Sequence, residues 1–190
     1  MHFDFLKIIK MDYLERFSIP LKGMNPGVHE FRFDIDNEFF SNFENSLISK
    51  GIYDVKLTCD KKERMFILNF EISGKYSAAC DRCLAQIEIP SLIDYTFYLK
   101  YGLAGKQNDI REIDDVIFID ENDYKYNLAN IIYQMIVISL PYQNVYDCEN
   151  DPNPKCDFKM LGKLENEIEE IESEKITNPV WDKLKDFYKN

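Results

Sequence analysis

Two runs of alternating apolar and polar residues constrain the fold of this 190-residue chain more than any other feature. Apolar side chains occupy every second position from Tyr53 to Cys59 and again from Phe66 to Ile72, with a charged turn at residues 61–63 between the runs. A period of two is that of a half-buried strand, and two such runs joined by a short polar turn are typical of a β-hairpin. The sequence therefore predicts an antiparallel hairpin.

Shorter patterns of the same kind extend the expected sheet on both sides of the hairpin. Ser73-Gly74 is expected to break the second strand, because glycine is unfavourable inside strands. Pro20 is compatible only with an edge strand, since proline lacks the N–H that a ladder needs. The further strands are expected at residues 14–22, 31–35, 85–89, 93–99 and 116–119.

Helical spacing appears at residues 37–49 and 128–136, again at 161–171 in an amphipathic helix with an acidic back, and in the C-terminal segment. Apolar residues predict a helix over residues 37–49 that ends before Gly51. A second helix carries an apolar stripe from Leu128 to Ile136, and Asn127 is placed to cap its N-terminus. The expected fold class is α+β, with an antiparallel β-sheet or meander, a few helices packed on it, and a small cysteine-bearing knuckle.

One domain is expected over residues 1–176, followed by a short C-terminal helix at 177–190. Residues 102–115 are polar and without periodicity, and we expect them to form an acidic loop. The N-terminus lacks the pattern of a secretion signal, and no apolar run is long enough to span a membrane. We therefore expect a cytoplasmic protein with reduced thiols and no membrane partner.

The charge of the chain restricts its partners. Asp and Glu number 34 against 23 Lys and Arg, which gives a net charge of −11. Phosphate is repelled by such a chain at long range, so non-specific nucleic-acid binding is disfavoured and a basic partner is attracted. No phosphate-binding loop, zinc-protease motif or nucleophile elbow is present, so no small-molecule substrate is evident and no enzyme class is indicated.

Four of the five cysteines form two pairs in the sequence, Cys80 with Cys83 and Cys148 with Cys156. A C-x-x-C turn can grip one zinc ion with two thiolates while other ligands come from elsewhere in the fold. The second pair is spaced C-x7-C, longer than usual for zinc, so the alternative is that the first pair is packed in a turn without metal. A redox enzyme that uses Cys80 or Cys83 is a third, weaker hypothesis, because the residues after the turn alternate as a strand.

The order of these parts resembles the YceD family of large ribosomal RNA subunit accumulation proteins. The resemblance rests on Cys80-Asp81-Arg82-Cys83-Leu84, on the apolar helix that ends Ile138-Ser139-Leu140-Pro141, on the late Cys156, and on the closing segment from Asn178 to Leu184. The chain departs from the family pattern at Asn178 and Val180, where an acid and an arginine are usual, and Cys148 is local to this sequence.

The resemblance implies a non-enzymatic ribosome-biogenesis factor that supports accumulation or maturation of large-subunit ribosomal RNA. Its partner would be the precursor RNA or a large-subunit ribosomal protein. Arg82 in the cysteine turn and Lys75 before it are the expected RNA contacts, since both could meet phosphate in an otherwise acidic molecule. The alternative is an acidic adaptor or chaperone that binds a basic ribosomal protein.

Overall fold

The predicted hairpin is confirmed in a computed structural model, which describes residues 13–102, 115–148 and 150–163. Strand β3 (Gly51–Lys61) pairs antiparallel with β4 (Met65–Ala79). Both strands are longer than the alternating runs, and the pairing continues over the whole of β3. This ladder is the centre of the larger sheet.

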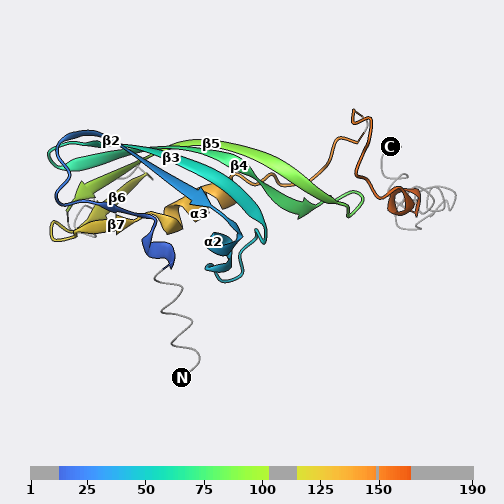
Figure 1. The fold of residues 1–190 in the computed structure, drawn as a ribbon, viewed down its shortest axis with the longest axis horizontal. Coiled ribbons are helices and arrows are strands. Elements are labelled where there is room, and N and C mark those ends of the chain that lie inside the picture. Colours follow the sequence, from blue (N-terminus) through green and yellow to red (C-terminus); the bar gives the residue numbers. More distant parts are fainter. Residues whose placement is uncertain (1–12, 103–114, 149, 164–190) are drawn as a thin grey trace, which may run out of the picture. The chain divides into compact units, whose positions relative to one another are not determined.

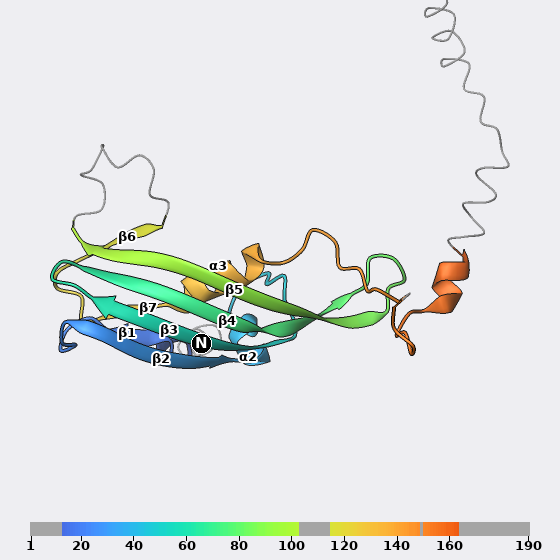
Figure 2. The same ribbon diagram turned by 90° about the horizontal axis from the view of Figure 1, so that it is seen from above.

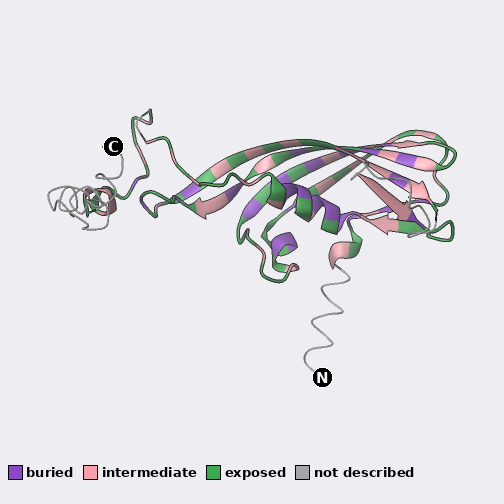
Figure 3. Ribbon diagram, turned by 180° about the vertical axis from the view of Figure 1, so that it is seen from behind, coloured by how far each residue is buried: buried purple, intermediate pink, exposed green. Residues whose placement is uncertain are grey.

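The register of the ladder decides which side chains enter the core. Val55 lies opposite Ile72 and Leu57 opposite Phe70, and all four side chains are at most 2% exposed. Successive side chains of a strand point to opposite faces, so the polar residues between them lie on the other face. Figure 3 shows this alternation of buried and exposed residues along the strands.

Three further strands complete a five-stranded sheet of order β2-β3-β4-β5-β6, namely β2 (Gly27–Ile35), β5 (Gln86–Tyr101) and β6 (Val116–Ile119). Figure 2 shows the five strands side by side. The α+β fold class with an antiparallel sheet is confirmed for β2 to β5, and the pair β5–β6 is parallel, so the sheet is mixed at this edge. A parallel neighbour needs a crossover of about a dozen residues or more, and the segment between β5 and β6 is long enough.

One face of this sheet is covered by helices and by a second, two-stranded sheet. Strand β1 (Ser18–Pro20) pairs antiparallel with β7 (Lys125–Asn127), and the helices are α2 (Asn37–Ser41) and α3 (Ala129–Ile138). Figure 1 shows all of them on the concave side of the five-stranded sheet. Side chains from each of these layers form one hydrophobic core.

Aromatic rings join the helices to the rest of the core. Phe17 meets Phe39 of α2 edge to face, with ring centroids 4.9 Å apart. Phe43, just after α2, stacks on Tyr133 of α3 with centroids 3.9 Å apart. Such pairs stabilise a core beyond the area that they bury, so α2 and α3 are held together by ring contacts.

Helix α2 is shorter than the predicted helix over residues 37–49. The amide of Asn42 donates to the carbonyl of Glu38 at 2.7 Å, and side chains that bond the backbone in this way compete with helix propagation. Leu47, expected on the buried face, is 74% exposed. Gly51 begins β3 instead of ending a helix.

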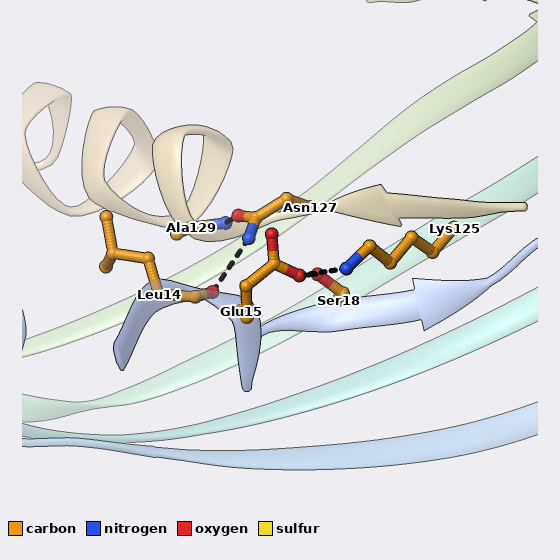
Figure 4. Close-up of polar contacts among 6 residues, drawn as sticks. All are labelled: Leu14, Glu15, Ser18, Lys125, Asn127 and Ala129. Atoms are coloured by element: carbon orange, nitrogen blue, oxygen red, sulfur yellow. Dashed lines mark hydrogen bonds and ion pairs between the residues drawn. The ribbon is translucent and has the colours of Figure 1, made fainter. Parts of the chain in front are cut away.

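Asn127 links the start of α3 to the N-terminal segment (Figure 4). Its Nδ2 donates to the carbonyl of Leu14 at 2.7 Å, and its Oδ1 accepts from the backbone nitrogen of Ala129 at 2.9 Å. The predicted capping role of Asn127 is thus confirmed in its hydrogen bond, although Leu128 is the N-cap residue by backbone position. An ion pair between Lys125 and Glu15 lies beside it.

The chain forms two compact units, and each unit is built from two separate stretches of the sequence. The first comprises the residues up to Ala78 and residues 88–143, and the second comprises residues 79–87 and those from Asn144 onward. Residues 103–114 of the expected acidic loop, most of the expected helix at 161–171 and the expected C-terminal helix at 177–190 lie outside the described residues. Among the helices that the structure describes, none is long and apolar enough to cross a membrane.

Gly74 does not break β4 as predicted, because the strand runs through it to Ala79. Its backbone lies opposite Tyr53, and the ring of Tyr53 occupies the space where a side chain would stand. A Cβ at Gly74 would lie 2.3 Å from the carbonyl oxygen of Ile52 and 2.5 Å from that ring. Glycine is therefore required here by close approach.

We expect Gly74→Ala to lower the free energy of unfolding by about 2–3 kcal/mol, because the added methyl group forces backbone and ring apart. Gly162→Ala is the matched control, since a Cβ at Gly162 meets nothing within 4 Å. Chemical denaturation of both variants measures the difference. Equal stability of the two variants would contradict the close approach at Gly74.

Asn127→Ala is expected to lower the free energy of unfolding by about 1–2 kcal/mol, because it removes two partly buried hydrogen bonds. Asn122→Ala is the control, because the backbone of Asn122 makes its hydrogen bonds in an exposed turn. Urea titrations followed by circular dichroism compare the two. A loss no greater than that of the control would show that Asn127 does not hold the N-terminal segment to α3.

Candidate functional site

The C-x-x-C turn between β4 and β5 forms a tight backbone knuckle. Leu84 N donates to Cys80 O and Cys80 N donates to Ala85 O, both at 2.8 Å. The backbone N–H groups of Arg82 and Cys83 donate to the thiol sulfur of Cys80. Leu84 has a φ of 59°, a left-handed conformation that is costly for a residue with a branched side chain.

A backbone bridge ties this turn to the segment that carries the later cysteines. Asp81 N donates to Asn144 O at 2.8 Å, and Asn144 N donates back to the Asp81 carboxylate at 2.7 Å. Both residues belong to the second unit. The chain thus brings together two segments that lie 63 residues apart in the sequence.

All four paired cysteines lie in this second unit as free thiols in mutual contact. Cys80 hydrogen bonds with Cys83, and Cys156 hydrogen bonds with both Cys148 and Cys83. Cys80 and Cys83 are fully buried, and Cys156 is 9% exposed. Among the described residues of the unit, Ile87 is the one other buried side chain.

These contacts shift the acidity of two thiols in opposite directions. The hydrogen bond that Cys156 donates to Cys148, together with burial and the bond to Cys83, raises the pKa of Cys156 to about 12. Burial alone would raise the pKa of Cys80, but the hydrogen bonds from the backbone of Arg82 and Cys83 outweigh it and lower the pKa. Cys80 is therefore the thiol whose negative charge the fold stabilises.

Arg82 points back at the thiols although it is exposed. Its guanidinium donates to the sulfur of Cys148 and also hydrogen bonds with Cys156. The electrostatic interaction with Cys148 and the bond to Cys156 raise the pKa of Arg82. Lys75, the other predicted RNA contact, belongs to the first unit and pairs with Glu88 at 2.8 Å.

The four predicted ligands thus lie together, in a chain of contacts that runs from Cys80 through Cys83 and Cys156 to Cys148. No three His, Cys, Asp or Glu side chains within the described ranges are placed to hold a metal ion as they stand. The fifth cysteine, Cys59, faces the core of the first unit, where burial raises its pKa to about 11. It behaves as the small hydrophobic residue that its position in the strand pattern predicted.

A second feature lies on the outer face of the five-stranded sheet, away from the helices. Two adjoining hollows of about 390 and 270 Å³ share Glu71 and Asp94 in their walls. Between them their linings contain four carboxylates and one ammonium group, from Asp54, Glu71, Asp94, Asp115 and Lys56. We call this feature the acidic groove.

Strand pairing creates the acidic groove. Lys56 lies opposite Glu71, with Nζ to Oε1 at 3.4 Å, so one carboxylate of the groove is partly neutralised. Asp54 lies opposite Asp34 of β2, a like-charge pair that adds negative potential at the margin. Leu92, in the wall of the smaller hollow, is 83% exposed. The groove therefore offers negative charge beside an open apolar side chain.

The acidic groove has no signature in the sequence, because its acids are far apart and share no motif. The available signal was the outward phase of Asp54 and Glu71 in two strands predicted to pair. This alternation places Asp54 and Glu71 on one face of the sheet. It does not show that Asp94, from a later strand, lies beside them.

A family model described as "Large ribosomal RNA subunit accumulation protein YceD" matches residues 68–188, more than half of the chain. The chain belongs to the YceD family. The match begins within β4 and includes the cysteine turn, β5, α3 and both later cysteines. No curated protein and no solved structure matches the chain. The YceD family is named for accumulation of large-subunit ribosomal RNA, so the chain is connected with biogenesis of the large subunit.

Proposed function

We propose that this protein is a non-enzymatic factor that supports accumulation of large-subunit ribosomal RNA by binding a basic segment of a large-subunit ribosomal protein. The acidic groove is the observation that carries this proposal. Its four carboxylates face one ammonium group in a chain of net charge −11. Lysine- and arginine-rich segments are attracted to such a surface over long range.

The shape of the groove supports a binding role. It is lined by residues from neighbouring strands of a sheet, which hold the carboxylates at fixed spacing. Leu92 can contact the aliphatic stem of a lysine or arginine whose charged end meets a carboxylate. Its lining combines carboxylates, hydroxyls and apolar groups, with neither histidine nor cysteine. These features suit transient binding of a flexible basic segment.

Direct RNA binding through Arg82 and Lys75 is the competing hypothesis. Each of these cations already contacts a partner within the chain, Cys148 for Arg82 and Glu88 for Lys75. A phosphate would have to replace those contacts and overcome the repulsion of the acidic chain. The charge distribution of the described residues therefore favours a basic protein partner over RNA.

Depletion of the protein in cells is expected to lower large-subunit ribosomal RNA relative to small-subunit RNA. Re-expression of the wild type should restore the ratio, whereas the double variant Asp54→Asn, Asp94→Asn should not. The control is Glu30→Gln, Glu63→Gln, which removes the same charge from exposed positions outside the acidic groove. An unchanged RNA ratio after depletion would refute the role in large-subunit accumulation.

Binding in vitro separates the two partners. Against purified large-subunit proteins, the groove variant should lose about two- to thirty-fold in affinity, as expected for two exposed charge pairs. The variant Arg82→Ala, Lys75→Ala should bind them as the wild type does. If instead the second variant loses affinity for a precursor RNA fragment and the groove variant binds the basic proteins normally, RNA is the partner and the groove proposal is wrong.

A further inference from the structure

The second unit has almost no hydrophobic core in its described part. Three of its four buried side chains are cysteines, and the fourth is Ile87. Small units without a sizeable apolar core usually need disulfides, a metal ion or a partner to hold them together. All four of its thiols are free, so disulfides do not close the unit.

The backbone of the C-x-x-C turn is arranged around the sulfur of Cys80. Two N–H groups, from Arg82 and Cys83, donate to Cys80 Sγ. A thiolate accepts such bonds much better than a thiol, which is a weak acceptor. The left-handed Leu84 closes the same turn. Strained conformations of this kind persist where the surroundings dictate them, often at ligand sites.

The four sulfurs form a continuous chain of contacts, from Cys80 through Cys83 and Cys156 to Cys148. In a tetrahedral zinc site with Zn–S distances of about 2.3 Å, neighbouring sulfurs lie roughly 3.8 Å apart. Hydrogen-bonded thiols contact each other at similar separations. The four thiols therefore already contact one another, and the Asp81–Asn144 bridge holds together the two backbone segments that carry them.

Charge balance gives Arg82 a second role. One divalent zinc ion with four thiolates carries a net charge of −2, and such a centre is costly to bury unless cations lie beside it. The guanidinium of Arg82 contacts Cys148 and Cys156, whereas the backbone N–H donors of the turn contact Cys80. Thiolates at both Cys80 and Cys148, the two ends of the chain of contacts, would thus have hydrogen-bond donors.

We propose that Cys80, Cys83, Cys148 and Cys156 bind one zinc ion as thiolates, and that this ion holds the two segments of the second unit together. Each thiol gives its proton to solvent as its sulfur becomes a ligand, so binding releases protons and involves no change of oxidation state. The site is closed, with four protein ligands, as structural zinc sites are.

Metal analysis of the full chain tests the site. Protein purified without chelators from zinc-supplemented cells should carry one zinc ion per chain by elemental analysis and native mass spectrometry. Cys156→Ser should lose the zinc, whereas Cys59→Ser should keep it, because Cys59 is a buried cysteine of the other unit. Trace zinc only, iron in its place, or equal zinc in both variants would overturn the proposal.

A second measurement on the wild type covers the case in which Cys156→Ser does not fold. Alkylation followed by peptide mapping should show Cys80, Cys83, Cys148 and Cys156 protected together, and a chelator should expose all four as zinc is released. Free alkylation of Cys148 in the zinc-loaded protein would overturn the four-thiolate site. A mass lower by two hydrogens, which indicates a disulfide, would overturn it as well.

Discussion

The antiparallel ladder between β3 and β4 is the interaction on which the rest of the structure depends. Its register turns Val55, Leu57, Phe70 and Ile72 into the core and sends Asp54, Lys56 and Glu71 to the opposite face. A slip of one residue would exchange the two faces, burying the charges and exposing the apolar side chains. The core and the part of the acidic groove formed by β3 and β4 are thus specified together by one set of backbone hydrogen bonds.

Much of the fold could be predicted from periodicity, because periodicity reports which face of an element is buried. The hairpin and the apolar stripe of α3 follow from it directly. Features set by individual contacts could not be predicted. The end of α2 depends on Asn42 bonding to Glu38, and the uninterrupted course of β4 depends on a tyrosine ring over Gly74. Neither leaves a periodic signal.

In the candidate sites, too, the features that depend on individual tertiary contacts could not be predicted from the sequence. Cysteine spacing predicted that two distant pairs would act together, and the structure places both in one unit. The expected RNA contacts Arg82 and Lys75 were chosen for their charge alone. Their actual neighbours, Cys148 and Glu88, come from segments whose proximity depends on tertiary pairing. Side-chain charge predicts affinity for a partner only when the local neighbours of that charge are known.

The second unit is assembled from two separated stretches of chain, and this has a consequence for the order of events during synthesis. Translation proceeds at about 5–20 residues per second, so the 63 residues between Asp81 and Asn144 require roughly 3–13 s. The strands β3 and β4 can pair during that interval, because both precede the gap. Cys80 and Cys83 emerge well before Cys148 and Cys156 are synthesised. The second unit can therefore form only after the strands β3 and β4 are complete.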